Sequence, residues 1–592
     1  MRLRSRPSVS RGALLALAAA LSALALAACS SPRAPRQAPD RIAFSVSGVD
    51  GDLRENVELT LGAMPPIAKN RAFVFRREIQ DKTLQALRAY GYYHPRVKLD
   101  FPKKDSLSRT VGVSIDPGKR LFIREADIEI LGEGASYKSF ERIIEQSGLK
   151  SYAPIYHGRY EELKKALQQN AMQLGFFDSK LIYSRIVVYE EQNCADIELV
   201  LDTGRRYSFG ALVADDATRE LLKPAARLYT LSEGTPFSSR RIQQFQAAMS
   251  QTGYYRSVDF QPRPDLKQGY RLPMELKLER RPKNVMRLGI GYSTDERVRL
   301  LAEWDKPLLN SAGHSLSTYA RISSVKQNAE AIYKIPRKDP NLDYYYLRLA
   351  QLHTDFNDTR SDLSHASFHY VANHTGKWRR DWSIRSEYED YTQGPEKGTA
   401  VDFMPGVLLS RRESSGGTDP ERAYDISADL SGGSRLFSDY DFFRAVVRLR
   451  GIMSPTPRTR VVLRFTQGWN TGSDAMKVPP SLRFFAGGDN SVRGFSYLSQ
   501  SPREEGMLTG GRYLTVGSAE FQFPLGSSGQ RGAVFLDAGK AYNHLGGGDM
   551  LYGPGIGYRY PSRFGTVRVD LAAGISDDDT SVKLHFAFGP EF

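Results

Sequence analysis

Arg493 is the side chain whose surroundings most clearly suggest a specific chemical role. It lies in residues 483–495, a segment rich in Gly and Asn that predicts a tight turn between β-strands. Asp537 follows later in the chain, within an apolar segment that predicts a strand. A buried carboxylate needs a partner, and arginine presents a planar fork that binds a carboxylate through two hydrogen bonds. The two residues are therefore a candidate buried ion pair.

Common catalytic and nucleotide-binding patterns are missing from the sequence. It contains no Gly-x-Ser-x-Gly elbow, no His-Glu-x-x-His pair and no phosphate-binding P-loop. The acidic run at residues 577–579 lacks the spacing of a calcium loop and predicts a solvated turn. We therefore expect a protein that is not an enzyme, with no catalytic residue, no metal site and no cofactor.

The N-terminus predicts export. Four arginines precede an apolar run at residues 13–28, which is too short for a membrane span and typical of a signal peptide, assigned here to residues 1–28. The run ends in Leu26-Ala-Ala-Cys29, which resembles a bacterial lipobox and makes Cys29 a candidate lipidation site. The alternative is cleavage at an ordinary small-residue site. Residues 29–40 are rich in Pro and predict a linker.

Composition narrows the class of protein further. The net charge of +15 comes from 82 basic and 67 acidic residues, and no basic run is interleaved with aromatic residues. This pattern does not favour nucleic-acid binding. The two cysteines cannot form a disulfide framework, and Cys194 is expected to be a small buried residue on a strand.

The first half of the chain contains a repeat. Gly91-Tyr-Tyr93, Gly175-Phe-Phe177 and Gly253-Tyr-Tyr255 each follow a stretch with apolar residues at helical spacing. A glycine in this place suits a left-handed helix C-terminus, and alternating strands follow it. Each unit is predicted to run strand, helices, strand, strand, so the half forms a tandem α+β array.

The second half changes to an alternation of apolar and polar residues. Met286, Leu288, Ile290 and Tyr292 alternate with polar or small residues, and the C-terminal segment that includes Phe586 and Phe588 does the same. Such alternation indicates one face toward lipid and one toward a polar lumen. We expect an all-β transmembrane barrel of about 16 antiparallel strands. A soluble β-sandwich is the alternative, and the export signal and the length disfavour it.

Two motifs then resemble a known family. Residues 483–495, with Val492-Arg-Gly-Phe495 at their end, resemble the loop-six signature of the BamA/TamA superfamily of outer-membrane-protein insertases. Phe535-Leu-Asp-Ala-Gly539 resembles the partner strand motif, with Phe535, Asp537 and Gly539 in the matching places. The resemblance implies that the repeats are POTRA domains at residues 41–119, 120–205 and 206–282, followed by an outer-membrane barrel at 283–592. Three POTRA domains and the terminal residues resemble the TamA-type members.

The resemblance also implies a function. Such a protein would reside in the outer membrane in contact with lipid, with its POTRA domains in the periplasm. It would help to insert or secrete unfolded β-barrel and autotransporter-type clients, together with a TamB-like partner anchored in the inner membrane. In this family the loop folds into the lumen and its arginine pairs with the strand aspartate, here Arg493 and Asp537.

We expect the clients to pass a seam between the first and last barrel strands. Gly289 and Gly291 weaken the first strand, and Pro590 cuts short the pairing of the last. The candidate seam residues are Gly289, Gly291, Phe586, Phe588 and Phe592. Two other functions stay open: a two-partner-type secretion pore, whose class resembles two POTRA domains with a plug helix, and a passive porin.

Overall fold

The computed structural model describes residues 42–102, 109–373, 377–416, 419–456, 458–526, 529–562, 565–576 and 580–589. The predicted signal peptide, Cys29, the linker, the acidic run at 577–579, Pro590 and Phe592 lie outside these residues. The chain divides into two units at residues 207 and 208, and each is considered by itself.

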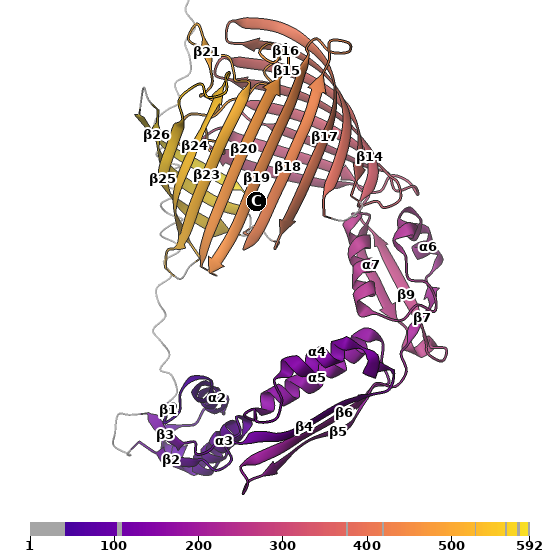
Figure 1. Cartoon of the computed structure of the whole chain (residues 1–592), viewed down its shortest axis with the longest axis vertical. Coiled ribbons are helices and arrows are strands. Elements are labelled where there is room, and N and C mark those ends of the chain that lie inside the picture. Colours follow the sequence, from indigo (N-terminus) through magenta and orange to yellow (C-terminus); the bar gives the residue numbers. More distant parts are fainter. Residues whose placement is uncertain are drawn as a thin grey trace, which may run out of the picture. The chain divides into compact units, whose positions relative to one another are not determined.

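The first unit contains two α+β modules, each with a three-stranded sheet (Figure 1). Module one consists of β1 (Ala43–Ser47), α2 (Gly51–Gly62), η1 (Lys69–Phe75), α3 (Arg76–Ala89), β2 (Arg96–Asp100) and β3 (Thr110–Asp116). Module two consists of β4 (Phe122–Leu131), η2 (Glu133–Ser136), α4 (Lys138–Ser147), α5 (His157–Leu174), β5 (Lys180–Tyr189) and β6 (Cys194–Asp202). In both modules the last strand lies at the centre, parallel to the first and antiparallel to the second.

The predicted apolar helix faces form the cores of these modules. Leu163, Leu167 and Ala171 of α5 are buried against the alternating residues of β6, among them Ile197 and Leu199. Gly175 closes α5 in the left-handed conformation with φ of 93°, as the sequence predicts. Cys194 is buried at the start of β6.

A repeated hydrogen-bond pattern joins the end of a helix to the end of its module. The Arg120 Nε donates to the carbonyl of Tyr90 at 2.7 Å, and the Arg206 Nε donates to the carbonyl of Leu174 at 2.6 Å. These two arginines occupy the same place in the Asp116-Pro-Gly-Lys-Arg120 and Asp202-Thr-Gly-Arg-Arg206 segments. Each therefore satisfies a helix C-terminal carbonyl that would otherwise lack a partner.

The second unit begins with a third module of the same topology. It comprises β7 (Ser208–Val213), α6 (Asp216–Leu222), η3 (Lys223–Leu228), α7 (Ser239–Gln251), β8 (Tyr255–Pro262), η4 (Pro264–Leu266) and β9 (Arg271–Arg280). This module contacts two turns of the β-sheet that follows it. The Tyr254 hydroxyl donates to the carbonyl of Gly313 at 2.7 Å, and Asn341 Nδ2 donates to the carbonyl of Ala248 at 2.8 Å.

The rest of the second unit is a closed antiparallel barrel of 16 strands, which confirms the predicted fold class. The strands, inclined side by side in Figure 1, are β10 (Val285–Ser293), β11 (Arg297–Lys306), β12 (Ser315–Ile322), β13 (Lys326–Pro336), β14 (Asp343–Phe356), β15 (Thr359–Ala372), β16 (Arg379–Gln393), β17 (Glu396–Ser414), β18 (Arg422–Gly433), β19 (Phe442–Thr456), β20 (Thr459–Thr471), β23 (Tyr513–Pro524), β24 (Arg531–Tyr542), β25 (Leu551–Ser562), β26 (Gly565–Ile575) and β27 (Thr580–Gly589). Residues 472–512 form the long loop between β20 and β23, which includes the short strands β21 (Arg503–Glu504) and β22 (Met507–Leu508).

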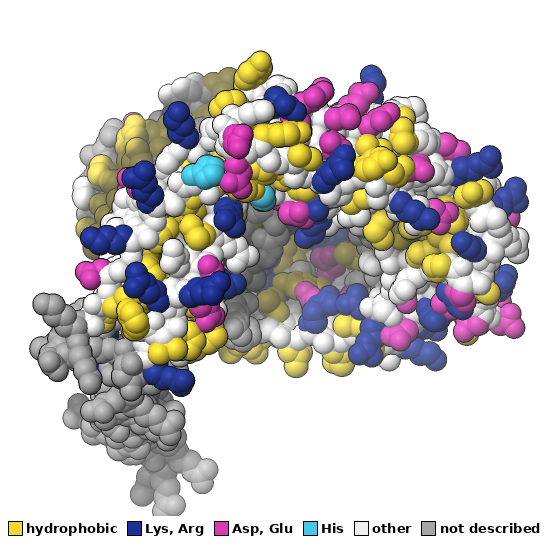
Figure 2. Space-filling model, turned by 90° about the horizontal axis from the view of Figure 1, so that it is seen from below, with side chains coloured by type: hydrophobic (Ala, Val, Ile, Leu, Met, Phe, Trp, Pro, Cys, Tyr) yellow, Lys and Arg dark blue, Asp and Glu magenta, His cyan; other side chains and the backbone are white. Residues whose placement is uncertain are grey.

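The barrel wall has the two faces that the alternation predicts. Leu288 and Ile290 of β10 and Leu584 of β27 are largely exposed on the outside, whereas His585 is buried on the inside. None of the described residues belongs to a helix long and apolar enough to cross a membrane. Figure 2 shows a face on which Lys and Arg side chains are interspersed with Asp and Glu side chains.

Candidate functional site

The structure brings Arg493 of the long loop into contact with Asp537 of β24. Nε donates to Oδ2 at 2.7 Å and Nη2 donates to Oδ1 at 2.9 Å, which is the two-pronged geometry of a guanidinium on a carboxylate. The backbone N–H of Arg493 donates to the same Oδ2 at 3.0 Å. Arg493 is 2% exposed and Asp537 is fully buried, so this part of the loop is held in the lumen against the inner face of the barrel.

Three further charged side chains extend this pair into a network across four neighbouring strands. Arg493 Nη1 donates to Glu520 of β23 at 2.8 Å and to Asp570 of β26 at 3.1 Å. Arg559 of β25 donates to Glu520 at 2.8 and 2.9 Å and to Asp570 at 2.5 Å. Two guanidinium groups thus hold three carboxylates, and each carboxylate is hydrogen-bonded to at least one arginine.

The remaining members of the two motifs pack around this network. The Cζ of Arg493 lies 3.2 Å from the ring centroid of Phe535, in cation–π contact. Val492 and Phe495 belong to a buried apolar cluster, completed by Ala486, Val516 and Leu551. Gly494 has φ of 94°, and a Cβ there would lie 2.3 Å from the backbone nitrogen of Gly574. Gly539 also allows a close approach, since a Cβ there would lie 2.7 Å from the carbonyl oxygen of Thr515.

The seam between β10 and β27 is built differently from the rest of the barrel. Within the described residues it has a single register pair, Ser293 with Ala587, whereas β10 pairs with β11 along its whole length from Val285 to Ser293. Thr294 adds two hydrogen bonds to the backbone of Phe586, accepting from its N–H at 3.1 Å and donating to its carbonyl at 2.9 Å. Among the described residues, the pairing of the first and last strands therefore lies near one end of β10.

The predicted seam residues have different positions in this interface. Phe586 contacts β10 directly, and its ring lies 5.6 Å from that of Tyr292. The carbonyl of Phe588 accepts from Arg299 of β11 at 3.3 Å. Gly289 and Gly291 pair with Leu301 and Arg299 of β11 and have no register partner on β27 among the described residues.

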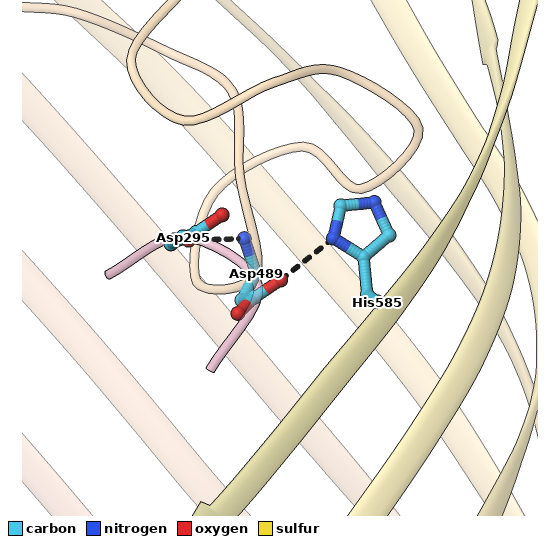
Figure 3. A group of neighbouring side chains, drawn as sticks. All are labelled: Asp295, Asp489 and His585. Carbon is cyan, nitrogen blue, oxygen red and sulfur yellow. Dashed lines mark hydrogen bonds and ion pairs between the residues drawn. The ribbon is translucent and has the colours of Figure 1, made fainter. Parts of the chain in front are cut away.

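Sequence reasoning missed two groups of residues. Glu520, Arg559 and Asp570 point inward on their strands, and their outward-facing neighbours are apolar. The alternation therefore predicts that each side chain faces the lumen, but it does not predict that the three contact one another. The other group is Asp295, Asp489 and His585, which converge beside the seam (Figure 3). They lie on the first barrel turn, the long loop and the last strand, and no local pattern connects them.

The fold and the site define an outer-membrane barrel with a loop held in its lumen and α+β modules before it. The Omp85 superfamily domain model matches residues 284–592, and the chain belongs to this superfamily. The model of POTRA domain TamA domain 1 matches residues 43–117, which places the chain in the BamA/TamA family. The barrel accordingly resides in the bacterial outer membrane and the POTRA modules in the periplasm.

Individual relatives are distant. A crystal structure of BamA from Haemophilus ducreyi lacking POTRA domains 1–3 is similar, with a TM-score of 0.61 at 16% identity over 79% of this chain and 99% of that one. The outer membrane protein assembly factor BamA of Nitratidesulfovibrio vulgaris is 21% identical over 355 residues, which are 57% of this chain and 44% of that protein. The chloroplastic outer envelope protein 80 of Arabidopsis thaliana is 31% identical over 140 residues, 21% of this chain and 17% of that protein. The chain spans less than half of the length of these curated relatives.

Proposed function

We propose that this protein is a TamA-like assembly or translocation factor for outer-membrane proteins. Unfolded β-barrel or autotransporter-type clients meet its POTRA modules and pass through the seam between β10 and β27. A TamB-like protein anchored in the inner membrane is the proposed partner. The work is done by strand pairing and requires no bond-making chemistry.

The observation that carries this proposal is the seam. Among the described residues, one register pair and the hydrogen bonds of Thr294 hold β10 to β27, so few of the described backbone groups of these two strands pair across the seam. An open edge of this kind is a template for pairing with an incoming chain. The opposite side of β27 is fully paired with β26 from Thr566–Gly589 to Ile575–Thr580, so opening is directed to one place.

The comparisons support the finer assignment in two ways. The first module matches the TamA-type POTRA model, which supports a TamA-like role and, with it, a TamB-like partner. The Nitratidesulfovibrio vulgaris relative is an assembly factor by name, which supports the client class.

The two alternatives fit the same site less well. A passive porin needs a free lumen, yet the long loop is fixed to inward side chains of β23 through β26 by Arg493. A two-partner-type secretion pore would serve one dedicated substrate, and its class resembles two POTRA domains, whereas three α+β modules precede this barrel. Large steady single-channel conductance would favour the porin, and loss of one exported protein alone on depletion would favour the secretion pore.

The experiment that tests the proposal locks the seam. In the double variant Ser293→Cys/Ala587→Cys the two cysteines occupy directly paired positions, which is a geometry that a disulfide can bridge. We expect the oxidised form to lose client assembly and the reduced form to recover it, measured as client abundance in the outer membrane. The matched control is Ala573→Cys/Val582→Cys, which crosses the fully paired β26–β27 interface. Full activity of the verified, oxidised seam variant would contradict passage through the seam.

A further inference from the structure

Arg299 of β11 reaches across the first barrel strand to the last one. Its neighbour Leu300 is exposed on the outside of the barrel, so Arg299 points into the lumen. Nη2 of Arg299 donates to the carbonyl oxygen of Phe588 at 3.3 Å, although β10 lies between the two strands in the barrel. A side chain from the second barrel strand is therefore bonded to the main chain of the last strand.

Gly291 of β10 makes this reach possible. It is the register partner of Arg299 on the neighbouring strand, so both residues face the lumen. A Cβ at Gly291 would lie 2.6 Å from Nε of Arg299 and 3.2 Å from its Cγ. The arginine side chain thus occupies the space that a side chain at position 291 would need. Gly291 therefore leaves open the path that Arg299 follows to β27.

The carbonyl of Phe588 lies where the main-chain pairing of the seam stops. Thr294 bonds to both main-chain groups of Phe586, so these groups face the seam, and those of Phe588, two residues further on, face the same way. Continuing the register of the seam by one position would bring Phe588 opposite Tyr292, but that pair is absent among the described residues. Arg299 supplies the donor that a neighbouring strand would otherwise give to this carbonyl.

Arg299 has few other contacts that would keep it in this place. Its Nε is buried without a hydrogen-bond partner, and in the described part of the chain no carboxylate pairs with its guanidinium. Arg287 of β10, by contrast, donates to Glu303 and to Asp305, each at 2.6 Å. A guanidinium bonded to one carbonyl can leave at the cost of one hydrogen bond, which an incoming main-chain donor can replace. The contact between Arg299 and Phe588 is therefore releasable.

We propose that Arg299 is a latch, a positioning residue that holds the last strand at the resting seam and is displaced by an incoming strand. The incoming strand is an extended segment whose main-chain N–H takes over the carbonyl of Phe588. That this strand belongs to a client rests on the proposed function. The latch itself is a property of the resting barrel, so it can be tested without any client.

The latch is tested by hydrogen–deuterium exchange of the full-length protein in detergent, read by mass spectrometry in the peptide that covers β27. We expect Arg299→Ala to speed the exchange of the seam-facing amides by roughly tenfold, the effect of losing one hydrogen bond from a charged donor. Arg299→Lys keeps a cationic donor and should restore most of the protection. Exchange in the peptide that covers β25 and the melting temperature of the barrel should stay unchanged, because a general loss of stability would alter both.

Two further variants test the path of the side chain. Gly291→Ala should push Arg299 aside and speed exchange in β27 as much as Arg299→Ala does, and the double variant should exchange no faster than either single one. The matched control is Arg568→Ala, which removes an arginine of β26 that lies opposite Ala587 on the fully paired side of β27. Its Nε is also buried without a hydrogen-bond partner, and its removal should leave the exchange of β27 unchanged.

The outcomes separate the latch from the proposed function. Unchanged exchange in Arg299→Ala, or an equal increase in Arg568→Ala, overturns the latch. In the proposed function Arg299→Ala should also raise the rate of client assembly, because the edge of β27 is free from the start. Faster exchange together with full activity of the seam disulfide would retain the latch and reject passage through the seam. Unchanged exchange together with an inactive seam disulfide would do the opposite.

Discussion

The long loop contacts two parts of the barrel that hold their strands together in contrasting ways. Strands β23 to β26 are paired along their lengths, and Arg493 adds a buried network of five charged groups across them. In the described part of the chain, the β10–β27 seam has one register pair and a few hydrogen bonds from Thr294 and Arg299. Both contacts come from one short stretch of the loop, since Asp489 lies at the seam and Arg493 in the network.

The difference assigns separate roles to the two regions. Removing one partner from a buried charge network is costly, so the network fixes where the loop lies. The few backbone bonds of the seam are individually weak, and in the proposed function they are exchanged for those of a client strand. In that proposal Arg493 is a positioning residue, and the strand edges of the seam carry out the exchange.

The largest effect is expected from Arg493→Ala. The substitution leaves Glu520 and Asp570 with Arg559 alone and removes the arginine hydrogen bonds of Asp537, which should cost about 3–5 kcal/mol of barrel stability. The measurement is the temperature at which the folded barrel loses its compact mobility in detergent gels. Arg503→Ala, which removes an exposed arginine of the same loop, is the control and should change stability by less than about 0.5 kcal/mol. Equal melting of the two variants would show that the network does not hold the loop.

Arg493→Lys sharpens the comparison by keeping the charge and removing the fork. A lysine cannot bind both oxygens of Asp537 and reach Glu520 and Asp570 together. We expect the variant barrel to insert at normal levels but to support little client assembly, because the loop is no longer held in register. Folded barrel and client abundance are measured in the same membranes. Normal client levels would mean that the network only stiffens the wall.

The parts of this structure that could be predicted from the sequence are those in which apolar residues recur at a regular local spacing. Helical spacing before Gly91, Gly175 and Gly253 and alternation after residue 283 predicted three α+β modules and a barrel, and both are confirmed. The pairing of Arg493 with Asp537 could be suggested because both stand out among apolar or Gly-rich neighbours. That these two side chains contact each other was implied by the resemblance to the BamA/TamA superfamily.

The rest depends on register and closure, which the sequence does not encode locally. Glu520, Arg559 and Asp570 become neighbours because of the register in which β23, β25 and β26 pair with the strands beside them. A register shift of one residue would turn each side chain outward. Asp295 and His585 meet because the first and last strands close the barrel. Such contacts join residues from opposite ends of the domain.

The smallest effect is expected from Gly289→Ala, which tests whether a weak first strand contributes to opening. The added Cβ would lie 3.4 Å from the Cβ of Leu301, an ordinary contact, so the substitution fits. Removing glycine from a strand should stabilise it by about 0.5 kcal/mol, which corresponds to roughly a twofold change in an opening equilibrium. Client abundance should therefore fall by about twofold or less.

Gly494→Ala is the contrasting control, because its positive φ and its approach to Gly574 allow no side chain. It should impair assembly as strongly as Arg493→Lys. If Gly289→Ala instead matched the oxidised seam variant, the flexibility of β10 along its whole length, and not the short pairing at Ser293, would control opening. The weakly held region of the barrel would then include the whole of β10 and not only its pairing with β27.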